Sequence, residues 1–336
     1  GESGAAARPA GAVPGARALG AAAAGTAVVG AAAVDAAAAA AAVVGTAAVG
    51  AAAVGVSASG AAASGAALPA RLSGSTGWAG SGAAAAGRSA RAASPIPWRS
   101  LALQDVLGEG ASGVIHRAIR HQGAECENVA VKLFKGAVTS DGLPLNEMAV
   151  CLGAGEHPNL IPVLGRIADH PAQAHGLVMD LIDARFRSLA GPPSFESCTR
   201  DVYAPEALFA PGVALRIARG IASVARHLHA RGINHGDLYA HNILHCGEGA
   251  AVLGDFGAAS FHPPGGSEVA EALQRIEVRA FGCLLEELLE RCTAGPGSDL
   301  RSALASLQAR CVAPDPDARP LFAEIERTLA GVRESV

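Results

Sequence analysis

The chain has 336 residues, of which 50% are apolar, and this supplies enough material for a sizeable core in one large domain or two smaller ones. The formal net charge is −4 and the sequence has no dense run of Lys and Arg, which excludes an extended basic surface, so no nucleic-acid partner is expected. The seven scattered cysteines form no C-x-x-C pair and have no histidines at zinc spacing, which favours free thiols in a reducing compartment, with the cytoplasm as the expected location.

Residues 1–97 differ from the rest of the chain because they consist mainly of Ala, Gly and Val. The decapeptide GTAVVGAAAV at 25–34 recurs as GTAAVGAAAV at 45–54, which is typical of low complexity, and we expect a disordered tail. The uncharged stretch 36–70 is long enough for a bilayer, but Ala and Gly contribute little transfer energy, so a membrane span is not expected. An organelle transit peptide, which is also poor in acidic residues, is an alternative for this tail.

The tail ends at Ser94-Pro95-Ile96-Pro97, where two prolines stop any helix, and a compact domain should begin near Trp98. Soon after, GEGASG at 108–113 fits the pattern G-x-G-x-x-G, which forms either an ordinary turn or a phosphate-binding loop. A dinucleotide fold requires a helix directly after these glycines. The residues that follow, 114–116 and 129–134, predict strands, which argues against that fold.

Lys132 lies in the second of these strands and is one of two lysines in the chain, the other being Lys135. An ammonium group among Val, Ala and Leu is costly unless an anion pairs with it or the side chain extends to water. The spacing predicts a helix over 145–152, where Glu147 is a candidate partner, and Cys151 lies on the same face one turn later.

The second half of the chain continues with further expected elements. Residues 176–182 predict a buried strand, and 216–229 place apolar residues at helical intervals. The stretch HGDLYAHNIL at 235–244 combines a histidine, an acid and an asparagine before an apolar tail, which alone is either a catalytic loop or a polar turn. Residues 243–245 and 251–253 then predict the two short strands of a hairpin.

Five motifs thus follow one another: the glycine-rich loop, V-A-V-K ending at Lys132, a helical glutamate ten residues before H-P-N, H-G-D-L-x-x-x-N, and D-F-G at 255–257. This order resembles the eukaryotic-type protein kinase catalytic domain over residues 98–332. The resemblance implies an α+β, two-lobed fold, in which a small antiparallel-sheet lobe carries helix C and a larger lobe is mainly helical. It also implies ATP and Mg²⁺ as cofactors and a protein as substrate.

By this resemblance Asp237 orients the attacking hydroxyl and accepts its proton. Lys132 contacts the nucleotide phosphates and has Glu147 as its carboxylate partner. Asn242 and Asp255 are the implied Mg²⁺ ligands, and the hairpin between them brings both ends of one metal site together. Part of the buried strand resembles the hinge that contacts adenine. The implied nucleotide-binding residues are Leu107, Gly108, Gly110, Gly113, Ile115, Ala130, Lys132, Met179, Asp180, Ile182 and Leu244.

Two positions of the catalytic loop depart from the family pattern. Gly236 stands where many kinases have arginine, so control through a phosphate on the activation segment is not expected. Tyr239 stands where many serine/threonine kinases have a lysine. His241 is a candidate to replace part of that charge, in the way that an arginine at this place does in tyrosine kinases.

The segment after D-F-G is short. Residues 277–282 resemble the start of the central helix of the large lobe, with Glu277 where the family has aspartate, and no A-P-E motif precedes them. Arg319 resembles the arginine that pairs with the missing glutamate of A-P-E. For this arginine we expect either a substitute partner, Glu268 or Glu271, or a surface position at a helix end.

The first functional hypothesis is an ATP-dependent protein kinase that phosphorylates protein hydroxyls, with Ser or Thr ahead of Tyr. Tyr239 and the short segment motivate an alternative, a pseudokinase that binds nucleotide or partners without turnover. Small-molecule phosphotransferases share H-G-D-x-x-x-x-N. They usually lack the glycine-rich loop, V-A-V-K and D-F-G found here, so the motif set favours the protein kinase.

Overall fold

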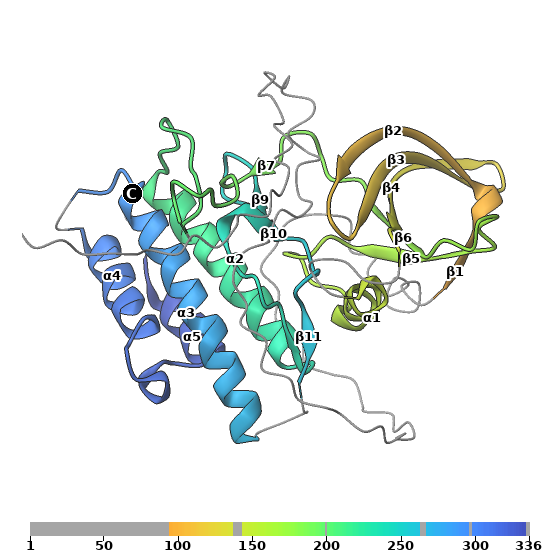
Figure 1. Ribbon diagram of the computed structural model, residues 1–336. Helices are drawn as coiled ribbons and strands as arrows, with labels where there is room; N and C mark the ends of the chain where they lie inside the picture. Colours follow the sequence, from red (N-terminus) through yellow and green to blue (C-terminus); the bar gives the residue numbers. More distant parts are fainter. Residues whose placement is uncertain (1–93, 137–142, 199, 263–266, 296–297, 334–336) are drawn as a thin grey trace, which may run out of the picture. The chain divides into compact units, whose positions relative to one another are not determined.

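The computed structural model of the chain describes residues 94–136, 143–198, 200–262, 267–295 and 298–333 (Figure 1). The expected tail, with its bilayer and transit-peptide alternatives, lies outside the described residues except for its last four positions. Within the described ranges no helix is both long enough and apolar enough to cross a membrane. The seven cysteines all lie inside these ranges and are free thiols.

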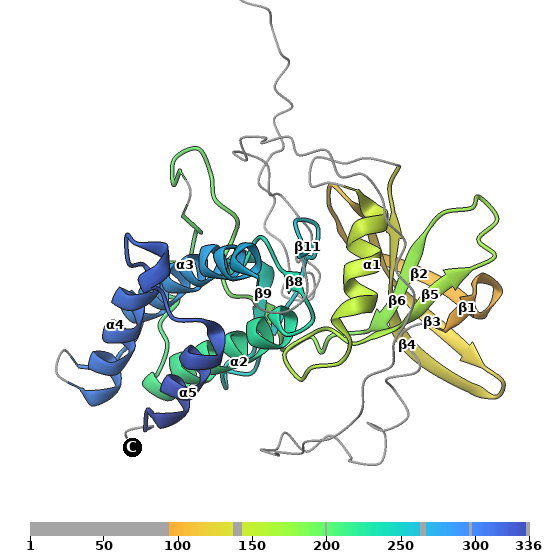
Figure 2. The same ribbon diagram turned by 90° about the horizontal axis from the view of Figure 1, so that it is seen from below.

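A curved six-stranded sheet forms the N-terminal part of the described chain (Figure 1). Its strands, in spatial order, are β1 (Pro95–Pro97), β5 (Val163–Ala168), β6 (Gly176–Asp180), β4 (Glu125–Phe134), β3 (Gly113–Gln122) and β2 (Leu101–Glu109). Neighbouring strands are antiparallel except β1 and β5, which are parallel. Helix α1 (Pro144–Ala154) lies beside the sheet in both views (Figures 1 and 2), and the helix and strands expected here are confirmed.

The first strand of the sheet begins earlier than the domain start expected near Trp98. Ile96 is 1% exposed and pairs with Ile167 on β5, so the stretch between the two prolines belongs to the sheet. Gly165 on β5 allows this contact, because a Cβ there would lie 2.4 Å from the carbonyl oxygen of Ser94. Ile96 also packs in the core of the sheet with Val131 and Val178. The prolines tolerate this place because an edge strand leaves their missing N–H groups outside the ladder.

The C-terminal part is mainly helical. Its helices among the described residues are α2 (Pro211–His229), α3 (Glu268–Glu290), α4 (Asp299–Cys311) and α5 (Phe322–Gly331). Helix α2 packs against α3 and α5, and its apolar residues at helical spacing, including Ile217, Ile221 and Val224, are 0% exposed. The two-lobed α+β fold that the resemblance implied is therefore confirmed, with a sheet lobe that carries α1 and a helical lobe built on α2.

Short strands and turns complete the helical lobe. The strands are β7 (Arg187–Ser188), β8 (Ile233–Asn234), β9 (Ile243–His245), β10 (Ala251–Leu253) and β11 (Ser260–Phe261), and the 3₁₀ turns of this lobe are Ala240–Asn242 and Pro316–Ala318. A further 3₁₀ turn, Trp98–Ser100, joins β1 to β2 in the sheet lobe. The expected hairpin is confirmed, because β9 and β10 pair in antiparallel register with Leu244 opposite Val252. Strand β9 also pairs with β7, and β8 pairs with β11.

Helix α3 begins nine residues before the expected start at Glu277. The hydroxyl oxygen of Ser267 accepts a hydrogen bond from the backbone N–H of Ala270 at 3.2 Å and so caps the helix. Glu268 and Glu271 lie in the first turn, where the helix dipole favours acids. The segment between D-F-G and this helix is therefore only residues 258–267, shorter than the sequence indicated.

Both expectations for Arg319 were wrong. Its side chain is buried rather than at the surface, and it donates to the carbonyl oxygens of Ala313 at 2.9 Å and Arg275 at 3.1 Å. Glu271 pairs with Arg275 at 3.5 Å instead. Because the donors of Arg319 are used by backbone carbonyls, this arginine joins α3 to the loop before α5 without a carboxylate partner among the described residues.

Candidate active site

The glycine-rich loop is a tight turn between β2 and β3. The backbone N–H of Gly110 donates to the carbonyl oxygen of Gly113 at 2.9 Å, which closes the turn. A Cβ on Gly113 would lie 2.5 Å from the carbonyl oxygen of Leu133, so only glycine fits at this close approach to β4. Lys135, just after β4, pairs with Glu109 and also donates to the carbonyl oxygen of Gly110 at 3.2 Å. The loop is thus fixed to the strand that carries Lys132.

Lys132 and Glu147 form a buried ion pair. In the sheet Lys132 lies between Ile115 of β3 and Leu177 of β6, and its side chain reaches the carboxylate of Glu147 on α1. The two residues are 5% and 2% exposed. The second carboxylate oxygen of Glu147 has no hydrogen-bond partner among the described residues. Pairing removes the main cost of placing an ammonium group in an apolar strand.

The thiol of Cys151 is influenced both by this ion pair and by Asp255 of the D-F-G motif. Burial raises the pKa of the Cys151 thiol to about 12, and the nearby carboxylates of Glu147 and Asp255 act in the same direction, while Lys132 opposes them. Three charged groups from β4, α1 and the D-F-G motif therefore lie close enough to act on one side chain.

The catalytic loop and the D-F-G motif are joined through their backbones. The backbone N–H of Gly254 donates to the carbonyl oxygen of Asn242 at 2.9 Å, which extends the β9–β10 ladder by one step and places Asp255 beside Asn242. His235 is 0% exposed, bonds the carbonyl oxygen of Gly254 at 2.8 Å and packs against Phe256. The two implied metal ligands are therefore neighbours, as the hairpin predicted.

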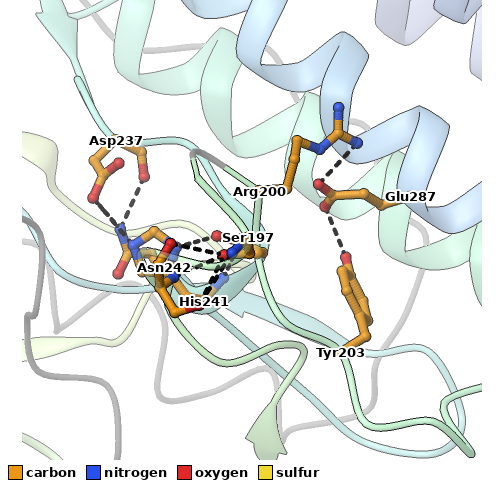
Figure 3. Close-up of polar contacts among 9 residues, drawn as sticks. Ser197, Arg200, Tyr203, Asp237, His241, Asn242 and Glu287 are labelled. Carbon is orange, nitrogen blue, oxygen red and sulfur yellow. Dashed lines mark hydrogen bonds and ion pairs between the residues drawn. The ribbon is translucent and has the colours of Figure 1, made fainter. Parts of the chain in front are cut away.

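Asp237 is held through one of its two carboxylate oxygens (Figure 3). Its Oδ2 accepts a hydrogen bond from the Asn242 amide at 2.8 Å and lies 3.3 Å from the Nε2 atom of His241. Burial acts to raise the pKa of Asp237, but the hydrogen bond and charge of His241, together with His235 and Asn242, bring it below its usual value. Among the described residues Oδ1 has no partner, so it is free to face a substrate.

His241 lies between two carboxylates. Its Nδ1 atom is 2.8 Å from Asp201 Oδ1, its Nε2 atom faces Asp237, and its backbone N–H donates to Asp201 Oδ2 at 2.9 Å. Burial opposes the charged ring, but the two carboxylates raise the pKa of His241 to about 10. The imidazolium is therefore a cation in direct contact with Asp237.

Gly236 has no room for the arginine that many relatives carry. Its backbone has a φ of +79°, which favours glycine, and a Cβ would lie 2.4 Å from the carbonyl oxygen of Ala258. The short segment after D-F-G packs directly on the loop at this point. The buried Glu277 accepts a hydrogen bond from the backbone N–H of Gly236 at 2.9 Å and also pairs with His229 on α2. Glu277 thus supports the loop from α3.

The short segment is also tied to α1. Asn146, which directly precedes Glu147 on α1, donates an amide hydrogen bond to the carbonyl oxygen of Ala259 at 2.9 Å. Strand β11 pairs with β8, and a Cβ on Gly153 of α1 would lie 3.2 Å from the ring of Phe261. These contacts hold α1 in the position at which Glu147 meets Lys132.

Sequence reasoning missed a second support of the loop, the strap, which we define as residues 200–203. Arg200 pairs with Glu286 at 2.9 Å and with the buried Glu287 at 3.1 Å on α3, and the hydroxyl of Tyr203 donates to Glu287 at 3.0 Å (Figure 3). Asp201 between them reaches His241. The strap lies in an irregular segment with no periodicity and no motif, so only an adjacent Arg and Asp in the sequence hinted at it.

The implied adenine-contacting residues lie on neighbouring strands. Ala130 on β4 pairs with Met179 on β6, and Val129 pairs with Asp180 where β6 ends. Leu244 is 1% exposed and packs in a small core with Ile182. The remaining two implied contacts, Leu107 and Ile115, are partly exposed and lie on β2 and β3 beside the glycine-rich loop.

These observations agree with the comparison to known families. The family model described as protein kinase domain matches residues 101–303. The chain belongs to the protein kinase family. The matched range contains the glycine-rich loop, Lys132, Glu147, the catalytic loop and D-F-G, together with the strap.

Over the aligned residues, similar kinases are about a quarter to a third identical to this chain. A probable serine/threonine-protein kinase of Encephalitozoon cuniculi is 29% identical over 167 residues, which are 49% of this chain and 28% of that protein. Dual specificity testis-specific protein kinase 1 of Rattus norvegicus is 27% identical over 224 residues, covering 54% and 33%. Calcium-dependent protein kinase 9 of Oryza sativa is 33% identical over 167 residues, covering 47% and 26%. The chain thus spans about a third or less of the length of these relatives.

Proposed function

We propose that this chain is an active, ATP-dependent protein kinase that transfers the γ-phosphate to protein hydroxyls, those of Ser or Thr first. The observation that carries the proposal is the geometry of Asp237, whose Oδ2 is fixed by Asn242 and His241 while Oδ1 has no partner among the residues that the structure describes. A carboxylate held in this way has one oxygen available to accept a proton from an approaching hydroxyl. Support for Ser and Thr comes from the names of the relatives, which include serine/threonine and dual-specificity kinases.

The proposed reaction needs little covalent work from the protein. The substrate hydroxyl oxygen forms a bond to the γ-phosphorus as the bond from that phosphorus to the bridging oxygen breaks, and ADP leaves with the electron pair. The hydroxyl proton passes to Asp237. In this scheme Lys132 stabilises phosphate charge and is itself held by Glu147, as their buried ion pair supports.

The donor set of the site fits Mg²⁺. Asn242 uses its amide nitrogen to bond Asp237, so its amide oxygen remains available as a ligand, and Asp255 supplies a carboxylate beside it. No group of three or more His, Cys, Asp and Glu able to hold a metal occurs among the described residues. This agrees with an ion that takes one or two protein oxygens and completes its shell with phosphates and water. When bound, Mg²⁺ neutralises charge on the transferred phosphate.

The nucleotide is proposed to bind between the glycine-rich loop and the hinge. Leu107, Ile115 and Ala130 would cover one face of adenine and Leu244 the other, with backbone groups of Asp180 to Ile182 at its edge. Gly108, Gly110 and Gly113 would let the loop backbone approach the phosphates. The strand register supports this, because Ile115 and Ala130 lie on neighbouring strands and Ala130 pairs with Met179.

A transfer assay tests the proposal. The purified full chain, with Mg²⁺ and γ-labelled ATP, should label casein or itself, and the Asp237→Asn variant should lose at least about a hundredfold in rate while its melting temperature still rises with ATP. A wild-type chain that is stabilised by ATP but transfers nothing would contradict the proposal and support a pseudokinase. Labelling of amino alcohols or sugars alone, with no protein labelled, would contradict it in favour of a small-molecule phosphotransferase.

A further inference from the structure

The strap contributes one residue directly to the catalytic loop. Asp201 is 9% exposed and uses both carboxylate oxygens on His241, one at the ring nitrogen Nδ1 (2.8 Å) and one at the backbone N–H (2.9 Å). The other ring nitrogen of His241 faces Asp237 Oδ2 at 3.3 Å. Figure 3 shows His241 and Asp237 of the catalytic loop together with Arg200 and Tyr203 of the strap. The ring of His241 cannot turn without losing both carboxylates.

Residues on both sides of Asp201 anchor the strap to α3. On one side Arg200 pairs with Glu286 and Glu287, and on the other the Tyr203 hydroxyl bonds Glu287. The guanidinium of Arg291 lies 3.9 Å above the Tyr203 ring, which adds a further contact to α3. A backbone bridge between Gly191 and Val202 closes the preceding loop. The place of Asp201 is therefore set by α3, the same helix that supports Gly236 through Glu277.

His241 and Asn242 are the loop side chains that contact the Asp237 carboxylate among the described residues. Gly236 has no side chain, and Tyr239 replaces the lysine of many relatives with a ring that stacks nearly parallel to His241, at an interplanar angle of 8°. The two bonds to the Asp237 carboxylate among the described residues both reach its Oδ2 atom, from Asn242 and from His241. Two donors at one oxygen fix the direction of the other oxygen, Oδ1.

We propose that Asp201 and His241 are positioning residues for phosphoryl transfer: the strap holds His241 against Asp237 Oδ2 so that Oδ1 points to the substrate hydroxyl. This inference rests on the proposed kinase activity. It assigns to the strap and α3 the ordering of the loop that an arginine and an activation-segment phosphate provide in other kinases. Misplacement of a catalytic group by about 1 Å costs about a hundredfold in rate, so loss of this support should appear in kcat.

The test uses variants of the full chain that separate positioning from folding. His241→Phe keeps the shape of the ring but leaves the buried Asp201 carboxylate without its partner. The main variant is therefore the double Asp201→Asn/His241→Phe, in which the amide oxygen introduced on the strap can still accept the backbone N–H of position 241. His241→Arg keeps donors for both carboxylates and serves as the rescue. Asp317→Asn changes a carboxylate whose side chain is 91% exposed and serves as the matched control.

For each variant we would measure the transfer rate with Mg²⁺-ATP and casein, the melting temperature, and the rise in melting temperature with ATP. We expect the double variant to lose about tenfold to a hundredfold in kcat, with KM for ATP within about twofold of wild type and a normal rise with ATP. His241→Arg should regain most of this loss, and Asp317→Asn should match wild type.

Two results would overturn the inference alone. The first is a double variant that keeps the wild-type kcat. The second is a loss of kcat that the His241→Arg variant shows equally, or a loss that comes with an equal rise in KM for ATP. Both forms of the second result would indicate a merely structural role. A wild-type chain that transfers no phosphate overturns the proposed function, and this inference with it. The failures of the two proposals are therefore distinguishable by the wild-type rate.

Discussion

Two of the buried charge pairs at the site are built in different ways. Lys132 and Glu147 are 15 residues apart, on a strand and on the helix that follows it, while His241 and Asp201 are 40 residues apart, and Asp201 lies in an irregular segment. The first pair follows from local periodicity, and the second depends on how the strap is anchored to α3. The half of the site around Lys132 is therefore set by regular elements, whereas the half around Asp237 is set by long-range contacts.

The largest effect is expected from breaking the first pair. Lys132→Met should reduce phosphate transfer by about a hundredfold or more, because it removes a cation placed to meet phosphate charge. Circular dichroism should show that the fold is retained. Lys135→Met is the contrast: it removes the other lysine, whose side chain is 42% exposed and pairs with Glu109 at the surface, so a smaller loss of rate is expected. Equal rates in wild type and Lys132→Met would show that the pair has no part in catalysis.

A second prediction concerns the loop position that lacks arginine. Gly236→Arg should lower activity rather than raise it, and Gly236→Ala should already destabilise the fold by about 2–3 kcal/mol, because Ala258 occupies the space of a Cβ and φ is positive. Chemical denaturation and the transfer assay measure the two effects. Gly247→Ala is the control, since a Cβ there has no neighbour within 4 Å. A faster Gly236→Arg enzyme would show that the loop is ordered by an arginine after all.

Acid should weaken the contact between helix α2 and the loop after α1, which contains His157. Burial lowers the pKa of His157 from 6.5 to about 4, with His227 and Arg231 acting in the same direction. Because the folded-state pKa lies below the unfolded value, the neutral ring stabilises the fold above about pH 6.5, and this stability is lost as pH falls toward 4. Ser223 and the backbone N–H of Asn159 bond the ring nitrogens.

The measurement for this prediction is the melting temperature between pH 7 and pH 4.5. The fall in wild type should be steeper than in His157→Gln, in which the titrating ring is absent. The exposed His175→Gln variant serves as the control and should keep the wild-type slope. Parallel curves for wild type and His157→Gln would contradict the assignment.

The smallest effect is expected from the outer anchor of the strap. Arg200→Ala removes two ion pairs, one to Glu286, whose side chain is 43% exposed, and one to the buried Glu287. Because the side chain of Arg200 is itself 43% exposed, solvent weakens both pairs and only a modest loss in stability is expected. Tyr203 still holds Glu287, so kcat should fall by less than about threefold. A hundredfold loss in this variant would show that Arg200 itself, rather than Asp201, acts on the loop.

The sequence was sufficient for the elements with a clear period or motif. The strand of Lys132, the helix of Glu147 and the hairpin that joins Asn242 to Asp255 all follow from spacing over a few residues, and the structure contains each of them. The start of α3 could not be placed, because the cap at Ser267 lies outside the family motif that begins at Glu277.

The contacts that sequence reasoning missed involve residues far apart in the chain. The bond of Asp201 to His241 depends on loop closure and on α3, and nothing in the local pattern around Asp201 specifies it. The expectations for Arg319 were wrong for a similar reason, because backbone carbonyl groups from two separate segments accept hydrogen bonds from its guanidinium. Backbone acceptors carry no side-chain signal, so a sequence gives no indication of them.

The account holds that this kinase domain is ordered for catalysis by Glu277, the strap and the short segment, without a phosphate on that segment. The most direct test is the initial rate of transfer from γ-labelled ATP to casein by the full chain after complete dephosphorylation and removal of the phosphatase. The account predicts transfer from the first turnovers, without a lag, at the rate of the untreated protein. Binding of ATP without any transfer, or transfer only after a lag that ends with self-phosphorylation, would contradict it.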